Sequence, residues 1–115
     1  YRILCDLLPE NHELRRYMGE PFVLPADVYA CEERRGEAGW TWYTGSSGWY
    51  FRVVTEELLG LKLWQGRLYI RPNLPDGFPT CSVIFGRLRI VLEQCEISVN
   101  GEKYDGKGIP YEEIM

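Results

Sequence analysis

The hydrophobic period of this chain changes at Gly60. Before this glycine, the clearest pattern is in residues 46–59, SSGWYFRVVTEELL, where apolar side chains recur at helical spacing. After it, apolar and polar residues alternate as they do in half-buried strands. The segments with this alternation are 61–65, 67–72, 81–86, 87–94 and 96–100. The sequence therefore predicts an α+β fold, with a helical part at residues 1–60 and an antiparallel, sandwich-like β domain at residues 61–115.

The helical part contains several start and stop signals. Ser46 or Ser47 is expected to cap the 46–59 helix, and Gly60 to end it in the left-handed conformation. The broad apolar face of this helix predicts deep packing. Further upstream we expect a helix that stops before Pro9, irregular chain, a second short helix and a loop. These segments are residues 1–8, 10–20, 22–31 and 32–39.

The β part is divided by turn signals, of which Asn100-Gly101 is the most specific for a hairpin. Pro75-Asp76-Gly77 is typical of a tight turn between strands. About five short strands leave the edges of their sheets open. We therefore expect further chain, or a second copy, to complete the sheet.

Composition excludes little but weighs against some partners. The 115 residues carry a net charge of −4 and no basic stripe, which disfavours nucleic acid. No apolar run approaches the roughly 18 residues of a membrane span. The chain starts YRILCDLLPE, without Met or a signal sequence, within an amphipathic pattern. This start suggests a piece of a longer polypeptide.

Cysteine and histidine spacing does not suggest a metal site. None of the four cysteines, at positions 5, 31, 81 and 95, forms a C-x-x-C pair, and His12 is the single histidine. We expect no metal, and free buried thiols in a reducing compartment. A disulfide between distant cysteines stays open from sequence alone.

The run WTWYTGSSGW, residues 40–49, combines rings with small polar residues and holds three of the four tryptophans. Its Thr-Gly-Ser-Ser-Gly part lies at the predicted helix start, where free N–H groups and the helix dipole attract anions. An ordinary capped helix would have the same sequence. The rings fit either a hydrophobic core or a platform for sugar rings. A combined site for sugar and phosphate is the functional interpretation.

Four segments carry a family resemblance. They are GEPFVLPADVYA (19–30), GWTWYTGSSGW (39–49), LGLKL (59–63) and RLYIRPNLPDGFP (67–79). Together they resemble the C-terminal part of glycoside hydrolase family 94, over residues 1–110. The family contains inverting phosphorylases of cellobiose, chitobiose, cellodextrins and β-1,2-glucooligosaccharides, and the phosphorylase-like domain of cyclic β-1,2-glucan synthase. The WTWYTG form looks more like the synthase and β-glucan branch.

The resemblance implies an architecture and a site. Residues 1–60 would be the last helices of an (α/α)6 catalytic barrel, and residues 61–115 its C-terminal β domain. Thr44 and Gly45 would bind the attacking phosphate, with Ser46 as a weaker candidate. Asp27, Trp42 and Tyr43 would face the sugar.

The resemblance also implies where the chemistry lies. The general acid, an Asp, and the phosphate-binding His and Arg would lie upstream of residue 1, so Asp27 and Glu20 are not expected to be catalytic. His12 is expected to be structural. The implied co-substrate is inorganic phosphate with no cofactor, and the partners are a β-linked glucose oligosaccharide, the rest of the parent chain and a homodimer mate. The parent would be cytoplasmic, or the cytoplasmic part of a membrane-bound synthase, and the 115 residues alone would be inactive.

Two other classes of function remain open from the sequence. The chain could be a carbohydrate-binding module that uses its tryptophans without chemistry. It could also be a scaffolding or chain-length-regulating piece of a larger synthase.

Overall fold

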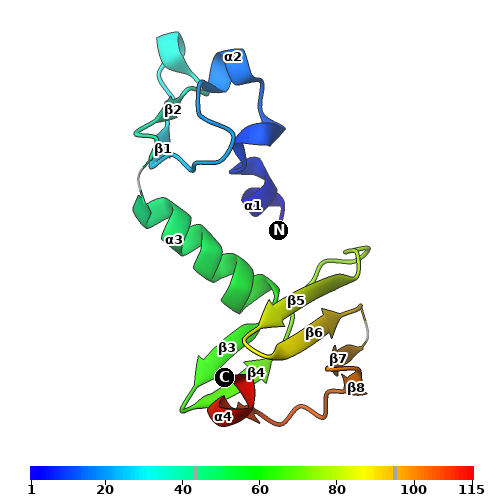
Figure 1. Cartoon of the computed structure of the whole chain (residues 1–115). Helices are drawn as coiled ribbons and strands as arrows, with labels where there is room; N and C mark the ends of the chain where they lie inside the picture. Colours follow the sequence, from blue (N-terminus) through cyan, green and yellow to red (C-terminus); the bar gives the residue numbers. More distant parts are fainter. Residues whose placement is uncertain (43, 95) are drawn as a thin grey trace. The chain divides into compact units, whose positions relative to one another are not determined.

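The computed structural model describes residues 1–42, 44–94 and 96–115. The chain divides into two compact units, Tyr1–Arg52 and Val53–Met115. Figure 1 shows short helices and a small hairpin in the first unit and antiparallel strands in the second. The predicted α+β class is therefore confirmed in its general form, as a small mixture of helices and antiparallel sheets.

The first unit consists of short elements around a two-stranded hairpin. Its helices are α1 (Arg2–Asp6), η1 (Pro9–Asn11), α2 (Leu14–Tyr17), η2 (Glu32–Arg34) and α3 (Thr44–Arg52). Its strands β1 (Asp27–Val28) and β2 (Ala38–Gly39) pair antiparallel. The segment 10–20, expected to be irregular, thus contains one 3₁₀ turn and one helix.

The helix predicted for residues 22–31 is wrong, because the backbone of this segment pairs across the hairpin instead. The Tyr29 amide donates to the Glu37 carbonyl at 2.9 Å, and the Ala26 amide donates to Trp40 at 3.3 Å. Close approach at Gly39 makes this pairing possible, since a Cβ there would lie 2.2 Å from Asp27 Oδ1. The hairpin also replaces part of the loop expected at residues 32–39.

The predicted 46–59 helix is present, but it begins earlier and is less buried than expected. It starts at Thr44 and continues after Arg52 as η3 (Val53–Leu58), a π-helical segment. Ser46 and Ser47 lie in its first turn, so the expected serine cap is wrong. No described side chain of α3 or η3 is fully buried, so the expected deep packing is not seen among the described residues. Gly60 ends the helix with a φ of +71°, as predicted.

The second unit contains two antiparallel sheets. The first has the order β3-β4-β9 and the second β5-β6-β7-β8. Their strands are β3 (Leu61–Trp64), β4 (Arg67–Ile70), β5 (Cys81–Phe85), β6 (Leu88–Leu92), β7 (Ile97–Val99), β8 (Glu102–Lys103) and β9 (Ile109–Pro110), and α4 (Tyr111–Ile114) follows. All five predicted strands are present. The completion of either sheet by further chain or a second copy stays a prediction.

The core of the second unit draws on both sheets and on α4. It is formed by Leu61, Leu68, Ile70, Leu88, Ile90, Leu92 and Ile114, each at most 4% exposed. These residues alternate with exposed or half-buried ones along β4 and β6, as period two requires. Among the described residues, no helix is long and apolar enough to cross a membrane.

Candidate functional site

The N-terminus of α3 lies in the tryptophan-rich run. The helix begins at Thr44, so the amides of its first turn have no acceptor within the helix. Gly45 is exposed and Ser46 is half-buried. The Ser46 hydroxyl is 3.5 Å from the Leu24 carbonyl oxygen, to which it donates a long hydrogen bond. This helix start can therefore attract an anion through its backbone amides and its dipole.

Two tryptophans precede this helix on an unusual backbone. Trp40 has a φ of +49° and Trp42 a φ of +65°. For bulky L-residues this left-handed region is disfavoured, so surrounding contacts must hold the conformation. Both rings are largely exposed, at 75% and 62%. Within this unit they are thus surface residues and not core residues, while Tyr43 lies outside the described residues.

Trp42 is held by contacts from the segment that follows α2. Its indole Nε1–H donates to Glu20 Oε1 at 2.8 Å. The ring also meets Phe22 edge-on, with centroids 5.8 Å apart. The backbone amide of Glu20 and then the Trp42 indole hydrogen-bond the carboxylate, which lowers the pKa of Glu20 below its usual value. Glu20 therefore carries a negative charge at neutral pH.

Asp27 lies on β1 opposite Gly39. Its carboxylate is exposed and covers the Gly39 backbone, leaving no room for a side chain there. The hairpin thus fixes Asp27 near the segment that leads to the tryptophans.

Glu20 and Phe22 are the residues that sequence reasoning missed. Their contact with Trp42 joins segments about twenty residues apart, and nothing in the local spacing indicates it. Arg16, on α2, donates through Nε to the Arg35 carbonyl at 3.1 Å.

His12 has structural contacts. Its ring stacks on Tyr17 with centroids 4.4 Å apart, and its Nε2 forms a short hydrogen bond with the Asp6 carbonyl. These contacts fit the structural role expected from the sequence.

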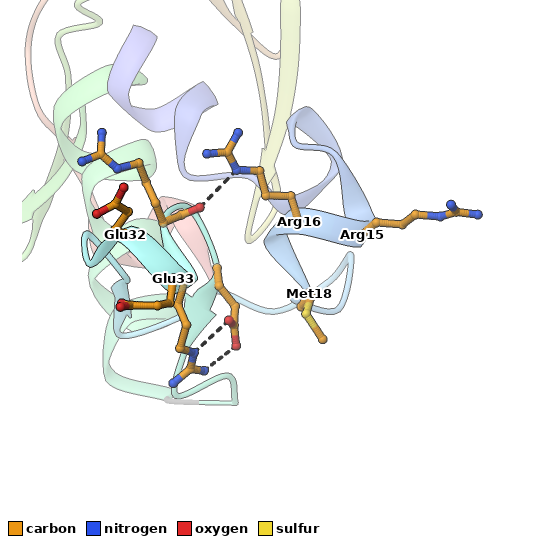
Figure 2. A pocket seen from close by; sticks show the side chains of 8 residues that line it. Arg15, Arg16, Met18, Glu32 and Glu33 are labelled. Atoms are coloured by element: carbon orange, nitrogen blue, oxygen red, sulfur yellow. Dashed lines mark hydrogen bonds and ion pairs between the residues drawn. The ribbon is translucent and has the colours of Figure 1, made fainter.

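A charged pocket of about 780 Å³ lies between α2 and the tip of the hairpin. Figure 2 shows its lining side chains, which are Arg15, Arg16, Met18, Glu32, Glu33, Arg34, Arg35 and Glu37. Arg34 forms a two-pronged ion pair with Glu37 and lies over the Tyr29 ring, 3.8 Å from its centroid. Arg15 points away from the other lining side chains in the figure. Because both acidic and basic groups line it, the pocket does not favour ligands of one charge.

Side chains that commonly bind metals do not cluster in the described part of the chain, and the expected absence of a metal stays a prediction. No group of three or more His, Cys, Asp or Glu side chains there could hold an ion. Cys5, Cys31 and Cys81 are free, and Cys95 lies outside the described residues. Cys31 is exposed, so the expectation that the thiols are buried is wrong for this residue.

Comparison with known protein families gives a match over the first half of the chain. Residues 1–60 match the model of the glycosyl hydrolase 94 superfamily, catalytic domain. The chain belongs to this family, and the resemblance seen in its sequence is confirmed.

Two curated relatives are much longer than this chain. The chain is 36% identical over 114 residues to the cyclic beta-(1,2)-glucan synthase NdvB of Rhizobium meliloti (strain 1021), a match that covers 95% of the chain and 4% of that protein. It is 40% identical over 50 residues to the solabiose phosphorylase of Paenibacillus borealis, covering 44% of the chain and 6% of that protein. The chain therefore spans only a small part of the relatives it matches.

Proposed function

We propose that this chain is part of an enzyme that synthesises or phosphorolyses β-linked glucans. The parent would be an inverting carbohydrate phosphorylase or a cyclic β-1,2-glucan synthase. Membership of the glycosyl hydrolase 94 superfamily supports this proposal, as do relatives that are named a glucan synthase and a phosphorylase. The second relative supports the phosphorylase reading, and the longer match to the first supports the synthase reading.

The phosphate-binding role falls to Thr44 and Gly45, with Ser46 as a third donor. One observation carries this assignment: α3 begins at Thr44. The amides of its first turn have no acceptor within the helix, and these amides and the positive end of the helix dipole suit a dianion. Gly45 has no side chain to obstruct that approach, and Ser46 would contribute mainly through its amide.

The sugar-binding role falls to Asp27, Trp42 and Tyr43. The exposed Trp42 ring offers a face against which the C–H groups of a pyranose can lie. Asp27 offers an exposed carboxylate that can accept hydrogen bonds from hydroxyl groups. Together these groups would form one wall of a glucan site beside the phosphate.

The reaction needs one proton donor and no general base. Phosphate is already an anionic nucleophile, so it attacks the anomeric carbon directly while a carboxylic acid protonates the leaving oxygen. Glu20 is unsuited to that role because the hydrogen bonds that lower its pKa keep it ionised. By the family resemblance, the acid would be an Asp outside these 115 residues, and the chain itself would carry no catalytic residue. Inorganic phosphate is the co-substrate, and no metal or organic cofactor is needed.

The parent architecture follows from the same proposal. Residues 1–60 would close an (α/α)6 barrel, and residues 61–115 would form the C-terminal β domain. The parent would act in the cytoplasm, alone or as the cytoplasmic part of a membrane-bound synthase, with a homodimer as its assembly. The exposed side chains of α3 would then be covered by parts of the barrel outside this chain.

The test is to incubate the full-length enzyme with β-glucan oligosaccharides and inorganic phosphate. Inversion at a β-linked glucose predicts release of α-glucose 1-phosphate, which is measured by NMR. The 115-residue chain alone is expected to release none, because it lacks the acid. Release of the β-anomer, or activity of the chain alone, would contradict the proposal.

The exposed aromatic rings also favour a second candidate, a carbohydrate-binding module without chemistry. Trp40, Trp42 and Phe22 present their rings to solvent within one unit. Calorimetry of this chain with glucan oligosaccharides separates the two functions. Clear binding of the oligosaccharide without phosphate supports the carbohydrate-binding module. No binding supports a partial sugar site that needs the rest of the enzyme.

A further inference from the structure

We propose that Glu20 is a positioning residue, which fixes the Trp42 indole so that its ring face, and not its N–H group, meets the sugar. This inference rests on the proposed function, since it assigns a role within the same sugar site. It concerns contacts inside the first unit alone.

The position of Glu20 is set by the close packing of the preceding residue, Gly19. Gly19 lies where a Cβ would be 2.9 Å from the Tyr17 ring and 3.3 Å from the Ala38 Cβ. Tyr17 is buried, and Ala38 belongs to strand β2. The residue before Glu20 is thus wedged between α2 and the hairpin, which gives the carboxylate a defined starting point.

The hydrogen bond from Trp42 to Glu20 uses the single polar group of the indole. Because Nε1–H donates to Oε1 at 2.8 Å, it is not available to a sugar hydroxyl. Trp42 as a whole residue is nevertheless 62% exposed. Phe22 meets it edge-on, which leaves ring surface open. The geometry therefore assigns Trp42 a stacking role.

The backbone conformation of Trp42 explains why its ring needs a hydrogen bond to hold its orientation. Its φ of +65° lies in a region that bulky residues disfavour, so the ring would not hold this orientation from local preference. An ionised acceptor forms a stronger hydrogen bond than a neutral one. Glu20 supplies that acceptor from a segment 22 residues away.

The first arm of the test reads the hydrogen bond directly by ¹⁵N–¹H NMR of the full 115-residue chain. Trp42→Phe assigns the Trp42 indole signal among the four tryptophans. Glu20→Ala should shift that signal upfield, and Glu20→Gln should restore most of the shift because its amide oxygen still accepts. Glu33→Ala, which changes an exposed carboxylate on η2, is the matched control. An unmoved Trp42 signal in Glu20→Ala would overturn the proposal.

The second arm uses steady-state kinetics of the full-length enzyme. Glu20→Ala should raise KM for the glucan by about tenfold, as expected for loss of a hydrogen bond to a charged group. It should leave KM for phosphate unchanged, and Glu20→Gln should recover most of the loss. Glu20→Ala combined with Trp42→Phe should be no worse than the more damaging single change. Additive losses would mean that Glu20 contacts sugar itself, and equal effects on both substrates would mean a general structural role; each result contradicts positioning.

Failure of the proposed function is distinguishable from failure of this inference. If the unmodified enzyme does not turn over any β-glucan with phosphate, the function fails and the sugar role of Trp42 fails with it. A shift of the Trp42 indole signal in Glu20→Ala would then still establish the hydrogen bond between Trp42 and Glu20. If turnover is normal and the signal does not respond to Glu20, only the positioning role is lost.

Discussion

Gly60 and Arg71 are in direct backbone contact. The Arg71 amide donates to the Gly60 carbonyl at 2.9 Å, and a Cβ on Gly60 would lie 1.9 Å from the Arg71 carbonyl oxygen. Gly60 has a φ of +71° and directly precedes β3, while Arg71 directly follows β4. This contact extends the pairing of β3 and β4 by one residue toward η3, and only glycine fits it.

Replacing Gly60 therefore tests this contact. Gly60→Ala should lower the free energy of unfolding by about 3 kcal/mol or more, because it adds a clash with backbone to an unfavourable φ. Gly101→Ala is the matched control, since Gly101 has a φ of +87° and nothing within 4 Å of a Cβ. It should cost about 1 kcal/mol. Urea unfolding followed by circular dichroism measures both, and equal losses would refute the role of the close approach.

The core of the second unit predicts a contrast between two isoleucines on neighbouring strands. Ile90 on β6 is 0% exposed, whereas Ile84 on β5 is 69% exposed. Ile90→Ala should cost about 2–5 kcal/mol of unfolding free energy through lost burial and a cavity. Ile84→Ala should change it by less than about 0.5 kcal/mol. The same urea measurement checks this, and a larger loss at Ile84 would indicate that its strand face is covered in solution.

The ion pair at the hairpin tip predicts a pH dependence. The Arg34 guanidinium donates to the Glu37 carboxylate, which lowers the pKa of Glu37 below its usual 4.5. The stabilisation is fully present above the unfolded pKa of about 4.5 and is lost as the pH falls through the lower folded value. The stability difference between the unmodified chain and Glu37→Gln should shrink over that range. NMR titration should find the pKa of Glu37 below 4.5 in the unmodified chain and closer to 4.5 in Arg34→Gln. The same Glu37 pKa in both proteins would contradict the pairing.

Thiol reactivity should separate two of the cysteines. Cys31 is exposed, whereas burial raises the pKa of the half-buried Cys81. Iodoacetamide reacts with the thiolate, so at pH 8 Cys31 should be modified first. Mass spectrometry of the digested chain at successive times measures the two rates. Faster modification of Cys81 would mean that its strand opens readily.

The β half was predictable because its signals are local. Alternation fixed the five strands, and Asn100-Gly101 forms the expected turn with φ values of +52° and +87°. The short β9 and α4 had no such pattern and were not predicted. Their positions depend on distant partners, as when the Arg87 amide donates to the Ile114 carbonyl at 2.7 Å.

The hairpin at residues 27–39 was not predictable by the same means. Its strands are two residues long, which is too short for a helical or a strand repeat of apolar residues to appear in the sequence. Apolar residues at 22–28 therefore suggested a helix, although cross-strand hydrogen bonds decide the structure. In the candidate site, Trp42 was predicted from the sequence, but its hydrogen bond to Glu20 is seen only in the structure.

Phosphate kinetics of the full-length enzyme test the central claim most directly. Thr44→Ala should raise KM for phosphate by about tenfold or more while leaving KM for the glucan nearly unchanged, because it removes one phosphate donor from the start of α3. Thr44→Ser keeps the hydroxyl and should restore most of the affinity. Unchanged phosphate dependence in Thr44→Ala would contradict the assignment of this helix start as the phosphate site.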